Sequence, residues 1–188
     1  AAYCQSVCAA LAANKDDPWL LGYYTDNELP WSSEMLPRYL KLSAEDPGRR
    51  AAEAWLADRK VEPTRLTDAL KDEFLEFAAE RYFRITAAAI RAADPHHLVL
   101  GARFHGAATQ LKPLLRATGK HCDVVSINYY RAWTPDAALT RMWTAESGRP
   151  FLITEWYAKA EDSGLGNTGG AGWLVRTQKD RGLYYQHF

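Results

Sequence analysis

Apolar residues along this chain fall into two patterns, short continuous runs and longer segments with helical spacing. A short apolar run bounded by turn residues is typical of a buried strand. Four such runs occur, at residues 19–26, 97–105, 123–130 and 151–156. Near-continuous apolar strands are expected where a parallel sheet is covered on both faces. The pattern therefore predicts four parallel strands.

The segments between these runs carry helix signals. We expect an opening helix over residues 1–16. Asp46 as N-cap and Pro47 at the first helical position predict a second helix, which reaches residue 60. Leu70 starts a helical spacing of apolar residues that continues until Asp94 and Pro95 end it.

Two further helices are predicted later in the chain. A short one is expected over residues 107–117 and ends at Gly119. Another begins at 134–136, where Asp136 follows Thr-Pro, and ends at Gly148, which is a favourable residue just past a helix end. Strands and helices thus alternate, without a linker between domains. This order predicts an α/β fold with a parallel sheet in one domain over residues 1–188.

Composition narrows the classes of ligand. The chain has 23 Lys plus Arg and 23 Asp plus Glu, so it lacks the excess positive charge that binds nucleic acid or anionic membranes. No apolar run approaches the roughly 20 residues of a membrane-spanning helix. The five histidines and three cysteines show no metal-ligand spacing, and we expect neither a disulfide nor a metal. A neutral or polar substrate suits this chain.

Polar and aromatic residues stand where each predicted strand ends. In parallel α/β proteins ligands bind beyond the carboxyl ends of the strands. The residues at these ends, in chain order, are Asn27, Glu28, Arg103, His105, Asn128, Tyr129, Tyr130, Glu155 and Trp156. We predict that they line one cleft.

Two of these residues are glutamates, Glu28 and Glu155. Retaining glycoside hydrolysis needs two carboxylates, one as acid and then base and the other as nucleophile. The acid must hold a proton, whereas the nucleophile must stay ionised, and hydrogen bonds from Arg103, Tyr129 or Tyr130 favour the ionised form. One strand-end glutamate alone is more often an ordinary loop residue, but two in matching positions favour catalysis.

Two stretches carry a resemblance to a known family. GYYTDNELPW, residues 22–31, and FLITEW with the residues that follow it, from 151 to 188, resemble the agarases of glycoside hydrolase family 50. These belong to the clan A retaining hydrolases, whose acid/base follows Asn at strand four and whose nucleophile ends strand seven of a (β/α)8 TIM barrel. The resemblance implies that Glu28 is the acid/base, that Glu155 is the nucleophile and that Asn27 binds the sugar 2-hydroxyl.

The resemblance also implies a substrate and a place of action. The expected substrate is a galactose-containing polysaccharide of the agarose type, and no cofactor is required because both catalytic groups are side chains. A polysaccharide does not enter the cytoplasm, so the parent enzyme is expected to be secreted or periplasmic. Two alternatives stay open, which are another clan A glycosidase, such as a β-galactosidase or β-glucanase, and a carbohydrate-binding barrel without catalysis.

The residues 164–169 match the dinucleotide fingerprint G-x-G-x-x-G, but they lack the strand, turn and helix that the motif requires. We interpret them as a loop over the mouth of the cleft. Trp156, Tyr157 and Trp173 are either sugar platforms or packing under this loop.

The ends of the sequence suggest a part of a longer protein. Only strands 4 to 7 of the implied barrel are present, and strands 1 to 3 and 8 are expected in the same parent chain. Alone, the 188 residues would expose two sheet edges and an apolar face. Several hundred Å2 of uncovered apolar surface forfeits on the order of 10 kcal/mol. We therefore expect the isolated segment to be inactive, and soluble only as an oligomer or with partial disorder.

Overall fold

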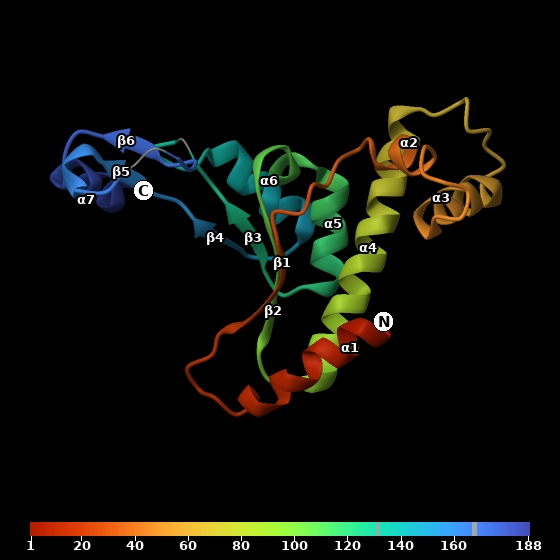
Figure 1. Ribbon diagram of the computed structural model, residues 1–188, viewed down its shortest axis with the longest axis horizontal. Helices are drawn as coiled ribbons and strands as arrows, with labels where there is room; N and C mark the ends of the chain where they lie inside the picture. Colours follow the sequence, from red (N-terminus) through yellow and green to blue (C-terminus); the bar gives the residue numbers. More distant parts are fainter. Residues whose placement is uncertain (131, 167–168) are drawn as a thin grey trace.

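Four parallel strands form the centre of the molecule. The computed structural model describes residues 1–130, 132–166 and 169–188. The strands are β1 (Gly22–Asn27), β2 (Leu98–Phe104), β3 (Val125–Asn128) and β4 (Phe151–Glu155), and they lie side by side in this order (Figure 1). The predicted α/β fold with a parallel sheet is confirmed. Each predicted run overlaps one observed strand.

Helices connect the strands along one face of the sheet. The connections contain α2 (Met35–Tyr39), α3 (Pro47–Asp58) and α4 (Asp68–Ala93), then η2 (Gly106–Gln110) and α5 (Lys112–His121), then α6 (Ala137–Ser147). Each new strand is added at the same side of the previous one, and parallel crossovers are right-handed, so their helices lie on one face. Figure 1 shows α4, α5 and α6 beside the strands in this arrangement.

Shorter elements lie before and after the sheet. The chain begins with α1 (Ala2–Cys8) and η1 (Ala9–Asn14), and β4 is followed by β5 (Ala158–Ala160), η3 (Glu161–Ser163), β6 (Trp173–Val175) and α7 (Gln178–His187). The strands β5 and β6 pair in parallel as a separate small sheet. In Figure 1, α2 with α3 and β6 with α7 extend to opposite sides of the upper end of the molecule.

The predicted helix caps are present. The Asp46 carboxylate accepts a hydrogen bond from the Gly48 N–H at the start of α3. The Asp136 carboxylate accepts from the Ala138 and Leu139 N–H groups at the start of α6. Gly148 ends α6 in the left-handed conformation, as its position predicted.

The helix predicted to end at Gly119 continues to His121, so that prediction was wrong. Gly119 serves close packing. A Cβ atom at this position would lie 1.8 Å from the Ser147 carbonyl oxygen, so the absent side chain lets α5 approach the end of α6. Glycine as a stop signal and glycine as a contact point look the same in a sequence.

The opening helix is also shorter than predicted. It ends at Cys8, and a 3-10 segment replaces it up to Asn14. Such tighter turns are common at the ends of α-helices. Cys4 and Cys8 are half-buried and Cys122 is buried, and all three are free thiols.

The main core lies between the sheet and the helices α4, α5 and α6. Its largest buried side chains are Phe83, Phe104, Leu114, Leu115, Ile127 and Trp143. The indole N–H of Trp143 donates to the Thr109 carbonyl at 2.8 Å, which satisfies its polar group inside the core. A second cluster, with Trp55 and Phe74 at its centre, holds α2 and α3 against α4.

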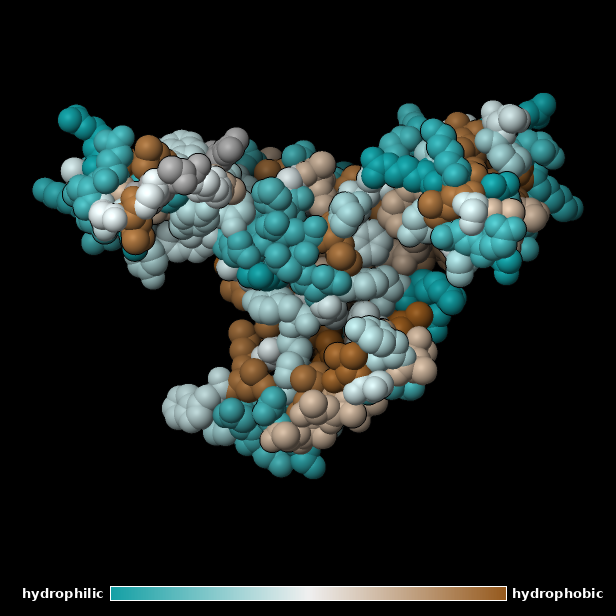
Figure 2. Space-filling model, in the orientation of Figure 1, coloured by the Kyte–Doolittle hydropathy of each residue, from teal (hydrophilic) through white to brown (hydrophobic). Residues whose placement is uncertain are grey.

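The outer strands are less covered than their apolar sequences predicted. Every residue of β3 is buried, whereas β1 and β4 contain half-buried and exposed positions. Within the described part of the chain, β1 and β4 each have one strand neighbour. Exposed apolar side chains, including Val7, Leu21 and Leu98, gather near α1 and the amino-terminal ends of the strands, where Figure 2 shows brown surface.

A buried charge network ties β1 to the start of β2. The Asp94 carboxylate accepts hydrogen bonds from the Tyr23 hydroxyl at 2.7 Å and from the His96 N–H, and it bonds His97 Nδ1 at 2.7 Å. Burial alone would raise the pKa of Asp94, but these hydrogen bonds outweigh burial and lower it below its usual range. The Asp17 carbonyl, followed by Asp94, raises the pKa of His97.

The close contact at Gly119 can be tested by adding one methyl group. We expect Gly119→Ala to lower the free energy of unfolding by about 1 to 3 kcal/mol, because the Cβ would overlap the Ser147 carbonyl. Chemical denaturation measures this change. Gly182→Ala in α7 is the matched control, since its Cβ would meet open space and alanine favours a helix. Equal stability of the two variants would contradict the packing role of Gly119.

The Asp94–His97 pair predicts a pH window of stability. A lowered Asp94 pKa stabilises the fold above about pH 4, and this contribution is lost as the pH falls below that value. A raised His97 pKa stabilises the fold most below about pH 6.5, and this contribution is lost as the pH rises through the folded-state pKa. The melting temperature should therefore fall more in His97→Gln than in the exposed control His96→Gln at pH 5, and this difference should shrink at pH 8. A difference that does not change with pH would refute the charge contribution.

Candidate active site

The predicted site residues meet at the carboxyl edge of the sheet. Register places Asn27 of β1 beside Arg103 of β2, and Asn128 of β3 beside Glu155 of β4. Glu28 follows β1 directly, and its backbone N–H donates to the Arg103 carbonyl at 2.9 Å. Two glutamates from the outer strands therefore share one edge with polar residues from the inner strands.

Backbone irregularities precede both glutamates. Thr25 is an extra residue in β1 and Thr154 is an extra residue in β4, each without a partner on the neighbouring strand. In β1 this shift follows an opposite one, in which Leu100 is the extra residue of β2. Such bulges bend a strand and re-aim the side chains that follow. Glu28 itself has a positive φ of 55°, which is uncommon for a residue with a side chain and concentrates at functional sites.

Glu155 is held by two donors. Arg103 Nη1 lies 2.7 Å from Oε1, and the Tyr130 hydroxyl donates to Oε2. Burial, followed by the hydrogen bond to Glu155, raises the pKa of the Tyr130 phenol, so this group remains a donor. A guanidinium and a phenol therefore each bond a separate oxygen of this carboxylate.

Glu28 is held by an amide. Asn128 Nδ2 donates to Glu28 Oε1 at 2.8 Å and approaches Asn27 Oδ1 at 3.3 Å. The Thr154 hydroxyl lies 2.7 Å from Asn128 Oδ1. Asn128 is 1 % exposed, so its amide bonds link three strand ends inside the protein. The two glutamates thus have different surroundings, a cation and a phenol for Glu155 and a neutral amide for Glu28.

The remaining predicted residues border this edge. His105 is exposed and its ring meets Tyr130 edge-on at 5.5 Å. A hollow of about 480 Å3 is lined by His105, Gly106, Thr109, Gln110, Asn128, Tyr129, Tyr130, Ala132, Leu139 and Ala171. Its position beside the strand ends suits a ligand that reaches Glu155.

Two predicted residues have structural contacts. The Tyr129 hydroxyl accepts a hydrogen bond from the Asp136 N–H at 3.0 Å, and its ring packs edge-on against Trp143. The Trp156 ring stacks on Phe188 with a centroid distance of 4.4 Å and also meets Tyr185. Their rings therefore join the sheet to α6 and α7.

The similarity of this chain to known proteins extends over nearly its whole length. No family model matches it. The solved structure of BpGH50 is 37% identical and superimposes with a TM-score of 0.88, over 100% of this chain and 43% of that one. An agarase, AgWH50C, is 26% identical with a TM-score of 0.75, over 98% of this chain and 29% of that one. The chain is close to the family 50 β-agarases.

A curated agarase agrees with this result. Beta-agarase B of Vibrio sp. (strain JT0107) is 24% identical over 93% of this chain and 22% of its own length. The chain therefore spans less than half the length of each of these relatives. The resemblance to family 50 agarases that the strand-end motifs suggested is confirmed.

Sequence reasoning missed the role of one residue in this candidate site. Thr154 stands at the end of the fourth apolar run but received no role from the sequence, although its hydroxyl contacts the Asn128 amide. A hydroxyl residue directly before a strand-end glutamate was the available signal. Asp26 in β1 accepts hydrogen bonds from the Asn27 N–H and the Tyr82 hydroxyl. Burial raises the pKa of Tyr82 to about 12, so this phenol also stays protonated.

The loop predicted over residues 164–169 includes Asn167 and Thr168, which lie outside the described residues. Nearby, Lys159 Nζ donates to the Gly169 carbonyl at 2.7 Å. Tyr157 and Trp173, the aromatic candidates beside this loop, are each 37% exposed. Tyr157 meets Tyr130 edge-on, which places it next to the site.

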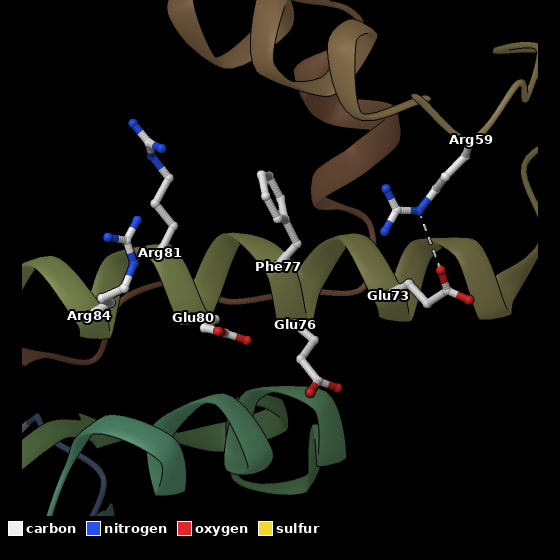
Figure 3. A pocket seen from close by; sticks show the side chains of 7 residues that line it. All are labelled: Arg59, Glu73, Glu76, Phe77, Glu80, Arg81 and Arg84. Atoms are coloured by element: carbon white, nitrogen blue, oxygen red, sulfur yellow. Dashed lines mark ion pairs between the residues drawn. The ribbon is translucent and has the colours of Figure 1, made fainter. Parts of the chain in front are cut away.

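A separate hollow follows α4, away from the strand ends. Figure 3 shows Phe77 with Arg81 and Arg84 along this helix and an ion pair between Arg59 and Glu73. The carboxylates on the side toward α5 are paired, since Glu76 contacts Arg116 and Lys120, and Glu80 contacts Lys120. These pairs join α4 to α5, so this hollow belongs to helix packing.

Two features are absent from residues 1–130, 132–166 and 169–188. Among these residues no group of His, Cys, Asp and Glu is arranged to hold a metal ion. In the same part of the chain no helix has the length and apolar character needed to cross a membrane.

Tyr130 provides a direct probe of the site. Its pKa is raised by burial and by Glu155, so we expect its phenol to ionise at higher pH than free tyrosine. Glu155→Gln should lower the Tyr130 pKa, because the anionic acceptor is removed. Alkaline titration followed by NMR of labelled tyrosines measures this shift, with the exposed Tyr185 as an internal control. An unchanged Tyr130 pKa in the variant would contradict the contact.

Proposed function

We propose that this chain is part of the catalytic domain of a retaining glycoside hydrolase that cleaves β-linked galactose-containing polysaccharide of the agarose type. The observation that carries the proposal is the position of Glu28 and Glu155. They stand at the ends of β1 and β4 on one edge of a parallel sheet, with Arg103, Asn128 and Tyr130 bonded to them. Similarity to family 50 agarases supports the substrate class.

The surroundings of the two glutamates support different roles. Glu155, beside Arg103 and Tyr130, is the nucleophile, because both neighbours stabilise a carboxylate. Its oxygen attacks the anomeric carbon while Glu28 gives a proton to the departing sugar oxygen. In the second step Glu28 takes a proton from water, which attacks the same carbon and releases Glu155. The acid is therefore regenerated in each cycle.

The sheet topology supports a barrel. Its strands follow in chain order without reversal, and the crossover helices share one face, which is the arrangement of a TIM barrel and differs from a doubly wound sheet. We propose that β1 to β4 correspond to strands 4 to 7 of a (β/α)8 barrel over residues 1–188. The other strands, in the same polypeptide, would cover the free sides of β1 and β4. The carboxyl edge is the active-site end of such barrels.

The proposed ligand and location follow from the substrate class. Asn27, Arg103 and His105 offer polar groups to sugar hydroxyls, and no cofactor is needed for double displacement. A polysaccharide does not enter the cytoplasm, so we propose that the protein is secreted or periplasmic. Chromatography of the products from agarose, a β-galactan and a β-glucan separates the agarose assignment from other clan A specificities.

The roles of the two glutamates are tested in the complete polypeptide that carries this sequence. We expect Glu155→Gln to abolish turnover of agarose, because no covalent intermediate can form. Glu28→Gln should lower kcat by about 10²- to 10⁴-fold, the usual contribution of general acid–base catalysis. Added azide should restore turnover of an activated aryl glycoside only in Glu28→Gln, because azide needs no base to attack the glycosyl-enzyme.

Glu161→Gln is the matched control, since this exposed glutamate lies beyond β5. Its kcat should equal that of the wild type. Wild-type turnover by Glu155→Gln on every β-galactoside tried would overturn the nucleophile assignment. Tight binding of oligosaccharide by a wild-type protein that cleaves none would instead favour a carbohydrate-binding barrel.

A further inference from the structure

The bulge in β4 places two neighbouring side chains at the site. Ile153 pairs with Ile127 and Glu155 pairs with Asn128, so Thr154 is the extra residue between these pairs. In a regular strand, neighbouring side chains point to opposite faces. Here Thr154 contacts Asn128 while Glu155 contacts Arg103 and Tyr130. The bulge therefore lets one strand reach both halves of the site.

Both ends of the Asn128 amide bond protein groups. Its oxygen lies 2.7 Å from the Thr154 hydroxyl, and its nitrogen faces Glu28 Oε1 and Asn27 Oδ1. An amide nitrogen has two donor hydrogens, and both have partners here. Asn128 is also 1 % exposed. A sugar hydroxyl is thus a poor partner for Asn128, and the side chain acts on its protein neighbours.

Charge and hydrogen bonding select one orientation of this amide. If the amide were turned around, its oxygen would face the Glu28 carboxylate and the Asn27 carbonyl oxygen, and acceptors would oppose acceptors. The Thr154 hydroxyl reinforces the observed orientation by donating to Asn128 Oδ1. The same hydroxyl lies 3.2 Å from the Ile127 carbonyl oxygen in β3, a longer contact that shares its single hydrogen.

This orientation has a consequence for the proton on Glu28. Oε1 accepts the Asn128 N–H, so a proton on Oε1 would oppose that hydrogen. This hydrogen bond therefore favours Oε2 as the oxygen that carries the acidic proton. The Asn128 amide donates to Asn27 Oδ1, so the side-chain N–H groups of Asn27 point to other acceptors.

We propose that Thr154 and Asn128 are positioning residues that direct the catalytic proton to Oε2 of Glu28 and the Asn27 amide nitrogen toward the substrate. This inference rests on the proposed acid/base role of Glu28. It couples the strand that carries the nucleophile to the acid/base, because Thr154 directly precedes Glu155. The sequence placed Asn128 among the substrate ligands. In this proposal Asn128 instead orients Glu28 and Asn27, which contact the substrate.

The test compares Thr154→Val, which keeps the side-chain shape but removes the hydroxyl, with Thr154→Ser, which keeps the hydroxyl. Two substrates of the complete polypeptide are used, an agaro-oligosaccharide and a dinitrophenyl glycoside of the same sugar. Only the first needs a proton on its leaving group. We expect Thr154→Val to lower kcat/KM about tenfold on the oligosaccharide, the loss of one hydrogen bond, and to leave the dinitrophenyl glycoside nearly unchanged. Thr154→Ser should restore most of the activity.

Thr144→Val is the matched control, because the Thr144 hydroxyl donates to the Thr140 carbonyl within α6. It should leave both substrates unchanged. If Thr154→Val lowers kcat/KM equally on both substrates, the role of the hydroxyl is structural only. If kcat/KM is unchanged on both substrates, the hydroxyl has no part in the reaction. Each of these results overturns the proposal.

A second readout separates this proposal from the proposed function. In protein with 15N-labelled asparagine, the Asn128 amide protons should shift as Glu28 titrates, and this response should be absent in Glu28→Gln and weakened in Thr154→Val. If the wild type cleaves neither substrate but shows this response, the hydrolase assignment fails while the positioning of Glu28 stands. If the Asn128 resonances do not respond in the wild type, the positioning proposal fails.

Discussion

Parallel pairing of four strands in their chain order is the constraint on which the rest of the structure depends. It sets every carboxyl end at one edge, so residues as distant in sequence as Asn27 and Asn128 lie within hydrogen-bond reach. It also requires a crossover between each pair of strands, and the right-handed preference of crossovers puts their helices on one face. Parallel pairing in chain order thus fixes both the position of the site and the face that the helices cover.

Close packing of the helical layer keeps this edge in place. The helix α5 approaches α6 where Gly119 meets Ser147, and Trp143 of α6 is wholly buried against the core. Tyr129, at the end of β3, bonds the start of α6. Because protein interiors resist small changes of volume, a shift of α6 would reach the strand end that carries Asn128.

The two ends of the sheet have different tasks. At the amino-terminal end, Asp94 and His97 form a buried pair that joins the chain before β1 to the start of β2. At the carboxyl end, Glu155 forms a partly exposed ion pair with Arg103, and the neutral amide of Asn128 donates a hydrogen bond to Glu28. Separation of stability from chemistry along the strand direction is the usual organisation of parallel α/β barrels.

The sequence by itself determined the elements and the chemistry at their ends. Apolar runs, Asp46, Asp136 and Gly148 are local signals, because strand burial and helix capping depend on near neighbours in the chain. Only the tertiary structure decided that Gly119 is a contact point, that Thr154 is a bulge residue and that Asn128 serves Glu28. Each of these depends on a partner more than 25 residues away or on strand register, and register is a property of two strands that neither strand's sequence contains alone.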